Sequence, residues 1–132
     1  MIKNSTMEKI IAERNRLKRN TWNFFSAKTY KPLSDRSFLN IIFKKAQKTY
    51  DKYVSFHSNI ENKNVITLND LRVIDSKLSK MFLFITEINV HFKNLIREMC
   101  LEKDFKKLTD NLEEESVSVW KEWFDRKGYV AA

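Results

Sequence analysis

Glycine and proline are almost absent from this sequence, which has one of each, Gly128 and Pro32, in 132 residues. A β-sheet protein needs a tight turn every ten residues or so, and tight turns draw on these two residue types. Hydrophobic residues make up 42% of the chain, and ten Phe, three Trp and four Tyr supply bulky side chains for a core. We therefore predict one folded all-α domain over residues 1–132, built from few, long elements.

Cysteine and histidine are also scarce. The one cysteine, Cys100, excludes an internal disulfide, and its place beside the apolar stripe described below predicts a buried, inert thiol. His57 and His91 each have a glutamate one turn away, Glu61 and Glu87, and such pairs can share a metal. An antiparallel pair of helices would separate the two histidines by about 30 Å. We therefore predict no metal site and no cofactor, with both histidines solvated or paired to these local glutamates.

Sequence motifs of catalysis and targeting are missing as well. The chain has no glycine-rich phosphate loop, no Gly-x-Ser-x-Gly elbow and no arginine followed four to six residues later by a histidine. It has no apolar segment of the kind found in signal peptides near its N-terminus, and its most apolar run, residues 81–85, is far too short to span a bilayer. We expect a cytoplasmic protein that is not an enzyme and does not enter a membrane.

The clearest pattern present is a stripe of apolar residues in residues 67–103, spaced alternately three and four apart as on one face of an α-helix. Thr67 and Asp70 have the spacing of a capping box at its start. The stripe consists of Leu71, Ile74, Leu78, Met81, Ile85, Ile88, Phe92, Leu95 and Met99. This segment predicts a long third helix at the centre of the core.

The flanking segments predict the other helices. The first is expected from Ser5 or Thr6 to Ala27, and the second over residues 34–60, after a connector in which Pro32 ends the helical run. Beyond the long helix, we predict a short helix over residues 104–112. A last helix should start at Ser116 or Ser118 and end at Gly128. The expected architecture is an antiparallel bundle of three to four helices with a long central third helix.

The length of the third helix raises a question of assembly. Unbroken, it would measure about 54 Å, whereas a compact domain of this size is under about 40 Å across. Either it breaks near residues 100–104, or a second copy of the chain covers the excess. Leu83, Val90 and Leu101 lie opposite the main stripe and form the predicted oligomer interface. Asn89, within the stripe, either fixes the register of such a pair or lies at a packing gap with its amide reaching solvent.

The net charge of +8 is unevenly distributed. Residues 1–63 hold 14 Lys/Arg and 5 Asp/Glu, whereas residues 64–132 hold 11 and 12. A basic half joined to a neutral half indicates a directed electrostatic surface, for which the usual partners are nucleic acid, an anionic membrane or an acidic protein.

The polar faces of the first two predicted helices favour a nucleic-acid partner, DNA or RNA. Lysine and arginine can neutralise phosphates, and arginine and asparagine can also contact base edges. The predicted binding residues are Lys9, Arg16, Arg19, Asn20, Asn23, Lys44, Lys45, Lys48 and Lys52. Trp22 and Tyr30 are either stacking partners for bases or parts of the core.

Three alternatives stay open. The chain can instead be a protein-interaction module, such as an inhibitor, immunity factor or adaptor, that docks an acidic partner through its basic half. The lysines and arginines can simply solvate the helix faces. The bundle can also be a mainly structural, self-associating protein.

Overall fold

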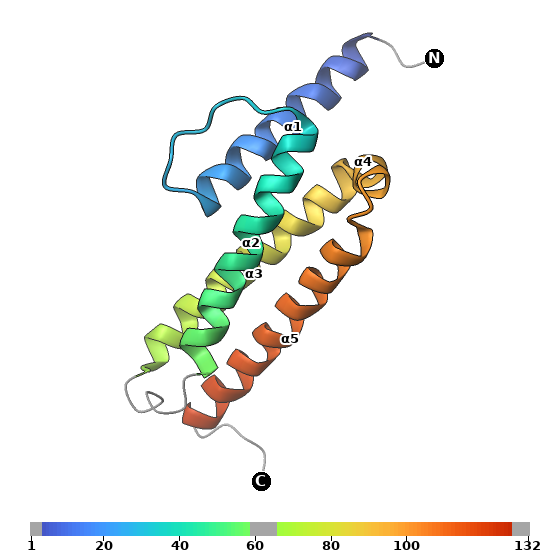
Figure 1. The fold of residues 1–132 in the computed structure, drawn as a ribbon. Coiled ribbons are helices and arrows are strands. Elements are labelled where there is room, and N and C mark those ends of the chain that lie inside the picture. The colour runs from blue at the N-terminus through green and yellow to red at the C-terminus, as the bar shows by residue number, and fades with distance from the viewer. Residues whose placement is uncertain (1–3, 59–65, 128–132) are drawn as a thin grey trace.

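The computed structural model describes residues 4–58 and 66–127, and these residues fold into five helices (Figure 1). The helices are α1 (Asn4–Phe25), α2 (Asp35–Ser58), α3 (Leu68–His91), α4 (Lys93–Glu98) and α5 (Glu102–Lys127). No strand occurs in these two stretches. The predicted all-α class is confirmed, with five helices in place of the three or four expected. The predicted ends of the second and last helices, at residue 60 and Gly128, lie outside the described residues.

Helix α3 begins at the predicted capping box. The Thr67 side chain accepts a hydrogen bond from the Asp70 backbone N–H (3.1 Å), and the Asp70 carboxylate accepts one from the Thr67 N–H (2.8 Å). These reciprocal bonds satisfy backbone donors that the first turn of a helix leaves without partners. The stripe from Leu71 to Phe92 is buried as predicted, and its last two members, Leu95 and Met99, pack half-buried against the core.

The prediction of one continuous helix over residues 67–103 is wrong, because the segment is divided into shorter helices. Phe92 leaves helical geometry (φ −119°, ψ 22°) and separates α3 from the short α4. The chain then reverses where a break was expected: α4 ends at Glu98, Cys100 has a positive φ of 58°, and α5 begins at Glu102. A non-glycine residue with positive φ is uncommon and marks a tight turn. At this turn Cys100 is exposed, so the prediction of a buried thiol is wrong.

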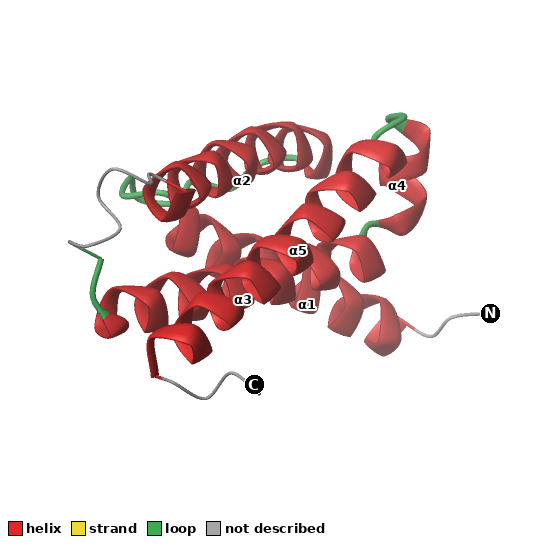
Figure 2. Cartoon of the chain, turned by 90° about the horizontal axis from the view of Figure 1, so that it is seen from below, coloured by secondary structure: helices red, strands yellow, loops and turns green. Residues whose placement is uncertain are grey.

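Helix α5 corrects the prediction of two C-terminal helices. It runs without interruption through the acidic residues 113–115 and through Ser116 and Ser118. Glutamate is a good helix former, and α5 has an apolar row to bury on either side of this run, so serine does not need to act as a cap here. After the reversal at Cys100, α5 returns along α3 in the opposite direction (Figures 1 and 2).

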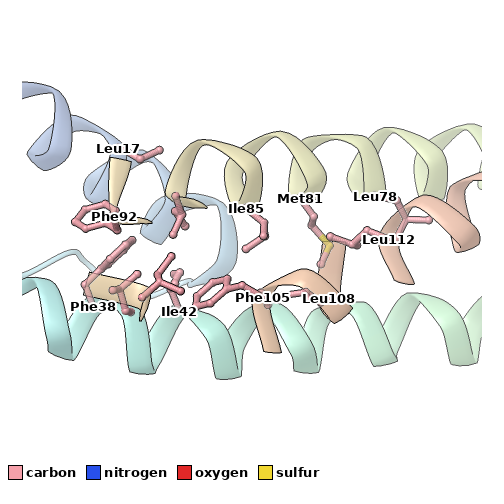
Figure 3. Packing of buried hydrophobic residues seen from close by; sticks show 14 of the residues in the cluster. Leu17, Phe38, Ile42, Leu78, Met81, Ile85, Phe92, Phe105, Leu108 and Leu112 are labelled. Carbon is pink, nitrogen blue, oxygen red and sulfur yellow. The ribbon is translucent and has the colours of Figure 1, made fainter. Parts of the chain in front are cut away.

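The core lies where α2, α3 and α5 meet, and α1 closes one end of it. Figure 3 shows Phe38 and Ile42 of α2, Met81 and Ile85 of α3, and Phe105 of α5 converging on one apolar layer. The Phe105 ring lies 5.2 Å from that of Phe43, and the Phe38 ring lies 5.9 Å from that of Phe92. Because these side chains alternate with polar ones at helical spacing, each helix buries one face and exposes the other.

Helix α3 runs antiparallel to both α2 and α5, whereas the first two helices are not antiparallel to each other. In Figure 1, α1 and α2 run in the same general direction, and the connector between them returns along their length. The side-chain contacts agree, because Lys18 pairs with Asp35 near the start of α2, whereas Trp22, farther along α1, lies under Lys45, farther along α2. A connector of nine residues, 26–34, can span about 30 Å, which is enough for this return.

No helix in the described part of the chain combines the length and the apolar character needed to cross a membrane.

Candidate nucleic-acid interface

The predicted binding residues lie on the surfaces of α1 and α2. Eight of the nine are exposed, and Lys45 is half-buried. Lysine and arginine side chains of these two helices form three ion pairs among the described residues: Arg16 with Glu13 (2.6 Å), Lys18 with Asp35 (2.9 Å) and Arg36 with Glu98 (3.1 Å). The other predicted cations form no ion pair with a described carboxylate. Their charge is therefore available to an external anion.

Helix α1 and helix α2 meet at an aromatic and basic junction. The Lys45 ammonium lies 5.1 Å above the centre of the Trp22 ring, within the range of a cation–π contact. The Trp22 indole N–H donates to the Lys28 carbonyl (2.9 Å), and its ring meets that of Tyr30 edge to face at 5.8 Å. Both rings are half-buried. The junction fixes the connector against both helices and leaves basic groups beside partly exposed aromatic rings.

The structure brings only some of the predicted residues together. Lys45, Lys48 and Lys52 lie within about 60° of one another on α2, and because Lys45 touches Trp22, they form the flank of α2 that faces α1. We call these three residues the α2 lysine flank. On α1, Arg19 lies on the same side as Trp22. The other α1 residues, Lys9, Arg16, Asn20 and Asn23, lie about 100° or more around the helix from Trp22, and Lys44 points away from the core of α2.

Two cations of α1 interrupt its apolar face, and both serve the packing of the helix. Lys18 is 5% exposed, and its ammonium donates to the Asp35 carboxylate (2.9 Å) and to the Leu33 carbonyl (2.8 Å). Arg14 lies with its guanidinium 5.4 Å above the Phe92 ring. A buried cation needs such partners because it has lost its hydration. Neither residue belongs to the exposed basic surface.

A polar cluster that the sequence did not predict joins α2 to α5. His57 is buried, and its two ring nitrogens face two carboxylates of α5: Nδ1 lies 2.6 Å from Glu115 and Nε2 lies 2.5 Å from Glu122. Arg126 donates to Glu122 (2.9 Å) and also to the Ile66 carbonyl. Each ring nitrogen thus has a carboxylate within hydrogen-bonding distance. The cluster ties the end of α2 to α5 through these polar contacts.

Burial alone raises the pKa of Glu122, but the hydrogen bonds and positive charges of His57 and Arg126 outweigh it. The net pKa of Glu122 therefore lies below its usual value. Burial and the nearby Glu115 carboxylate raise the pKa of Tyr50, one of the aromatic residues on the same side of α2. Glu122 is thus a carboxylate held in the ionised form at the helix contact.

This cluster corrects the expectation of a solvated His57, because the side chain is buried and both ring nitrogens lie against carboxylates of α5. The predicted partner, Glu61, lies outside the described residues. A signal for the true partners was present, because Glu115 and Glu122 continue the buried row of α5, which includes Phe105, Leu108, Leu112 and Val119, at the same three- and four-residue spacing. Carboxylates at core positions need a polar partner. His57 could be identified as that partner only from the packing of α2 against α5.

The described residues contain no group of three or more His, Cys, Asp or Glu side chains arranged to hold a metal ion. His91, on α3, is half-buried. In the His57 cluster the carboxylates occupy opposite edges of the ring, so both nitrogens are already engaged in hydrogen bonds.

The predicted interface residues of the long helix divide into two groups. Leu83 and Val90, on α3, are 61% and 69% exposed, whereas Leu101 packs half-buried against the core at the start of α5. Leu101 therefore does not continue the exposed surface of Leu83 and Val90. Asn89 is half-buried and lines an open groove between α3, α4 and α5 together with Lys93 and Lys106.

Comparison of the chain with protein-family models, with curated protein sequences and with solved structures finds no match.

Proposed function

We propose that the protein is a small, non-enzymatic accessory protein that binds DNA or RNA through the basic surfaces of α1 and α2, with little sequence specificity. The observation that carries this proposal is the set of exposed cations without carboxylate partners on these helices. Of the described carboxylates on these helices, Glu13 pairs with Arg16, Asp35 pairs with Lys18 and Asp51 accepts a hydrogen bond from the Gln47 amide, whereas Glu8 forms no ion pair with a described residue.

The α2 lysine flank and Arg19 are the proposed centre of the surface. Lys45 lies above the half-buried Trp22 ring, which meets the Tyr30 ring, so phosphates can contact the ammonium and guanidinium groups while a base approaches the ring edges. Arg16, Asn20 and Asn23 extend the polar surface around α1. Contacts to phosphate dominate such an interface, and contacts to phosphate carry no sequence information.

Salt dependence tests the electrostatic part of this proposal. Binding that neutralises about four phosphates should weaken about a hundredfold when monovalent salt rises from about 50 to 200 mM, because the condensed counterions are released less favourably. The measurement is the fluorescence anisotropy of a labelled, mixed-sequence oligonucleotide, single-stranded and double-stranded, titrated with the protein at each salt concentration. Affinity that stays constant across this range would exclude a phosphate-directed interface.

A second candidate is a protein-interaction module that docks an acidic partner through the same surface. The same free cations favour it, since a protein surface rich in carboxylates offers complementary charge. Electrophoretic mobility shift at low salt separates the two candidates, because only the first predicts a shift with generic oligonucleotides. A stoichiometric protein that co-purifies from cells without nucleic acid would favour the second.

A further inference from the structure

Helix α3 has an outer row of residues on the side opposite its core stripe. The row consists of Ser76, Lys80, Leu83, Glu87 and Val90, all of them exposed. Their spacing of four, three, four and three residues is that of the contact positions of a two-helix coiled coil. Leu83 and Val90 are the most exposed of the large apolar side chains among the described residues. The row thus has the spacing of a helix contact, but no helix of the described residues covers it, and only Leu83 also lines a groove beside α5.

The outer row is complementary to itself in one orientation. If a second α3 lies antiparallel across it, with a two-fold axis at Leu83, then Lys80 of each copy faces Glu87 of the other. The exposed Val90 of each copy then faces the small Ser76 of the other. A parallel pair would instead place Lys80 against Lys80 and Glu87 against Glu87. Charge and size therefore favour the antiparallel pair alone.

We propose that the outer row of α3 binds the outer row of a second copy of this chain, forming an antiparallel, two-fold symmetric dimer. Neither Lys80 nor Glu87 forms an ion pair with a described residue, so the new pairs replace no existing ones. Burying Leu83 against Leu83 removes exposed apolar area from water at the axis. This interface does not involve the basic surface of α1 and α2, and it stands whether or not the chain binds nucleic acid.

A contact through one helix face is small, so the dimer should be weak. Interfaces at the low end of the size range bury less than about 1,200 Å² and belong to transient complexes. We expect dissociation in the micromolar range, detectable by sedimentation equilibrium over protein concentrations from about 1 to 500 μM. A chain that sediments as a monomer at every one of these concentrations would overturn the proposal.

Charge reversal tests the pairing of Lys80 with Glu87. Lys80→Glu and Glu87→Lys, each alone, place like charges opposite each other twice in the dimer and should weaken it by tenfold or more. The double variant restores both pairs with exchanged signs and should recover most of the affinity. Lys93→Glu, a reversal of an exposed lysine outside the row, is the matched control and should change the affinity little. Failure of the double variant to recover would contradict this register.

Cysteine cross-linking tests the direction of the pair. In a Cys100→Ser background, Leu83→Cys places two thiols at the axis and should give a covalent dimer under mild oxidation. Val90→Cys places its two thiols about 20 Å apart in the antiparallel pair and should not. Cross-linking through both positions would indicate a parallel pair and overturn the proposal, as would cross-linking through neither. Since both residues are exposed, circular dichroism should show every variant folded like the parent.

Discussion

Helices α3 and α5 differ from α1 in what holds them in place. Along α3 a row of apolar side chains is buried from Leu71 to Phe92, the residue that ends the helix. Along α5 the buried apolar side chains extend from Phe105 to Val119. Helix α1 buries Leu17 and Thr21 together with a lysine, and its first turns leave Met7, Ile10 and Ile11 exposed. The C-terminal pair therefore supplies most of the cohesion, whereas α1 is held by a mixture of apolar and ionic contacts.

The distribution of charge follows the same division. Most cations of α1 and α2 form no ion pair with a described carboxylate, whereas the carboxylates of α5 include two that are engaged inside the molecule with His57. A charged side chain that is paired inside the molecule is not available to bind a partner. The comparison teaches that α1 adds little to the core, whereas α2 packs into the core with one face and carries proposed binding lysines on another.

The largest effect is expected from the C-terminal core. Phe105→Ala removes a fully buried ring that packs against Phe43, and it should lower the free energy of unfolding by about 3–5 kcal/mol through lost apolar burial and the cavity left behind. Urea unfolding followed by circular dichroism measures this. Met7→Ala, at an exposed position of α1, should change it by less than about 0.5 kcal/mol. Equal losses of stability in the two variants would contradict the conclusion that α5 contributes more to the core than α1.

The attachment of α1 depends on one buried charge. Asp35→Asn keeps the shape of the side chain but leaves the buried Lys18 side chain without its counter-charge, and it should lower the free energy of unfolding by about 2 kcal/mol. Glu13→Gln breaks the exposed pair with Arg16 on the same helix and should cost almost nothing. Unfolding in urea compares the two directly. If both substitutions prove neutral, the Lys18 pair does not hold α1 in place.

The His57 cluster predicts a dependence on pH. Because the folded state lowers the pKa of Glu122, the stabilisation is fully present above the unfolded-state pKa, about 4.3, and is lost as the pH falls through the lower folded value. Glu122→Gln should therefore cost about 1–2 kcal/mol at pH 7, and the difference from the parent should shrink below about pH 4. Glu114→Gln, an exposed neighbour on α5, is the control. A difference that is independent of pH would exclude an ionised Glu122 as its source.

Much of the fold could be predicted from local pattern. The capping box at Thr67 and the buried stripe of α3 depend on residues a few positions apart, so the sequence displays them directly. The break near Cys100 was one of two outcomes expected from the length of the helix relative to the size of the domain. The sequence predicted two helices in place of α5. A run of glutamates followed by serines resembles a helix boundary when the buried row of the helix is not known.

The candidate site shows the same limit. Exposure of Arg19, Lys44 and Lys48 followed from helical periodicity, which separates them from the apolar face. The partners of His57 lie 58 and 65 residues away in sequence, and no local pattern reports such a distance. The direction of α1 relative to α2 is likewise decided by packing, and it determines which cations share a surface.

The central claim is that α1 and α2 hold the binding surface, and one comparison of affinities tests it most directly. Reversal of Arg16, Arg19, Lys44 and Lys48 to glutamate should abolish oligonucleotide binding at about 100 mM salt without unfolding the chain. The matched variant reverses four exposed lysines of α4 and α5, Lys93, Lys103, Lys107 and Lys121, and therefore changes the net charge equally. Anisotropy titrations should show binding retained in this second variant. Retention in the first variant, or equal loss in both, would contradict the account.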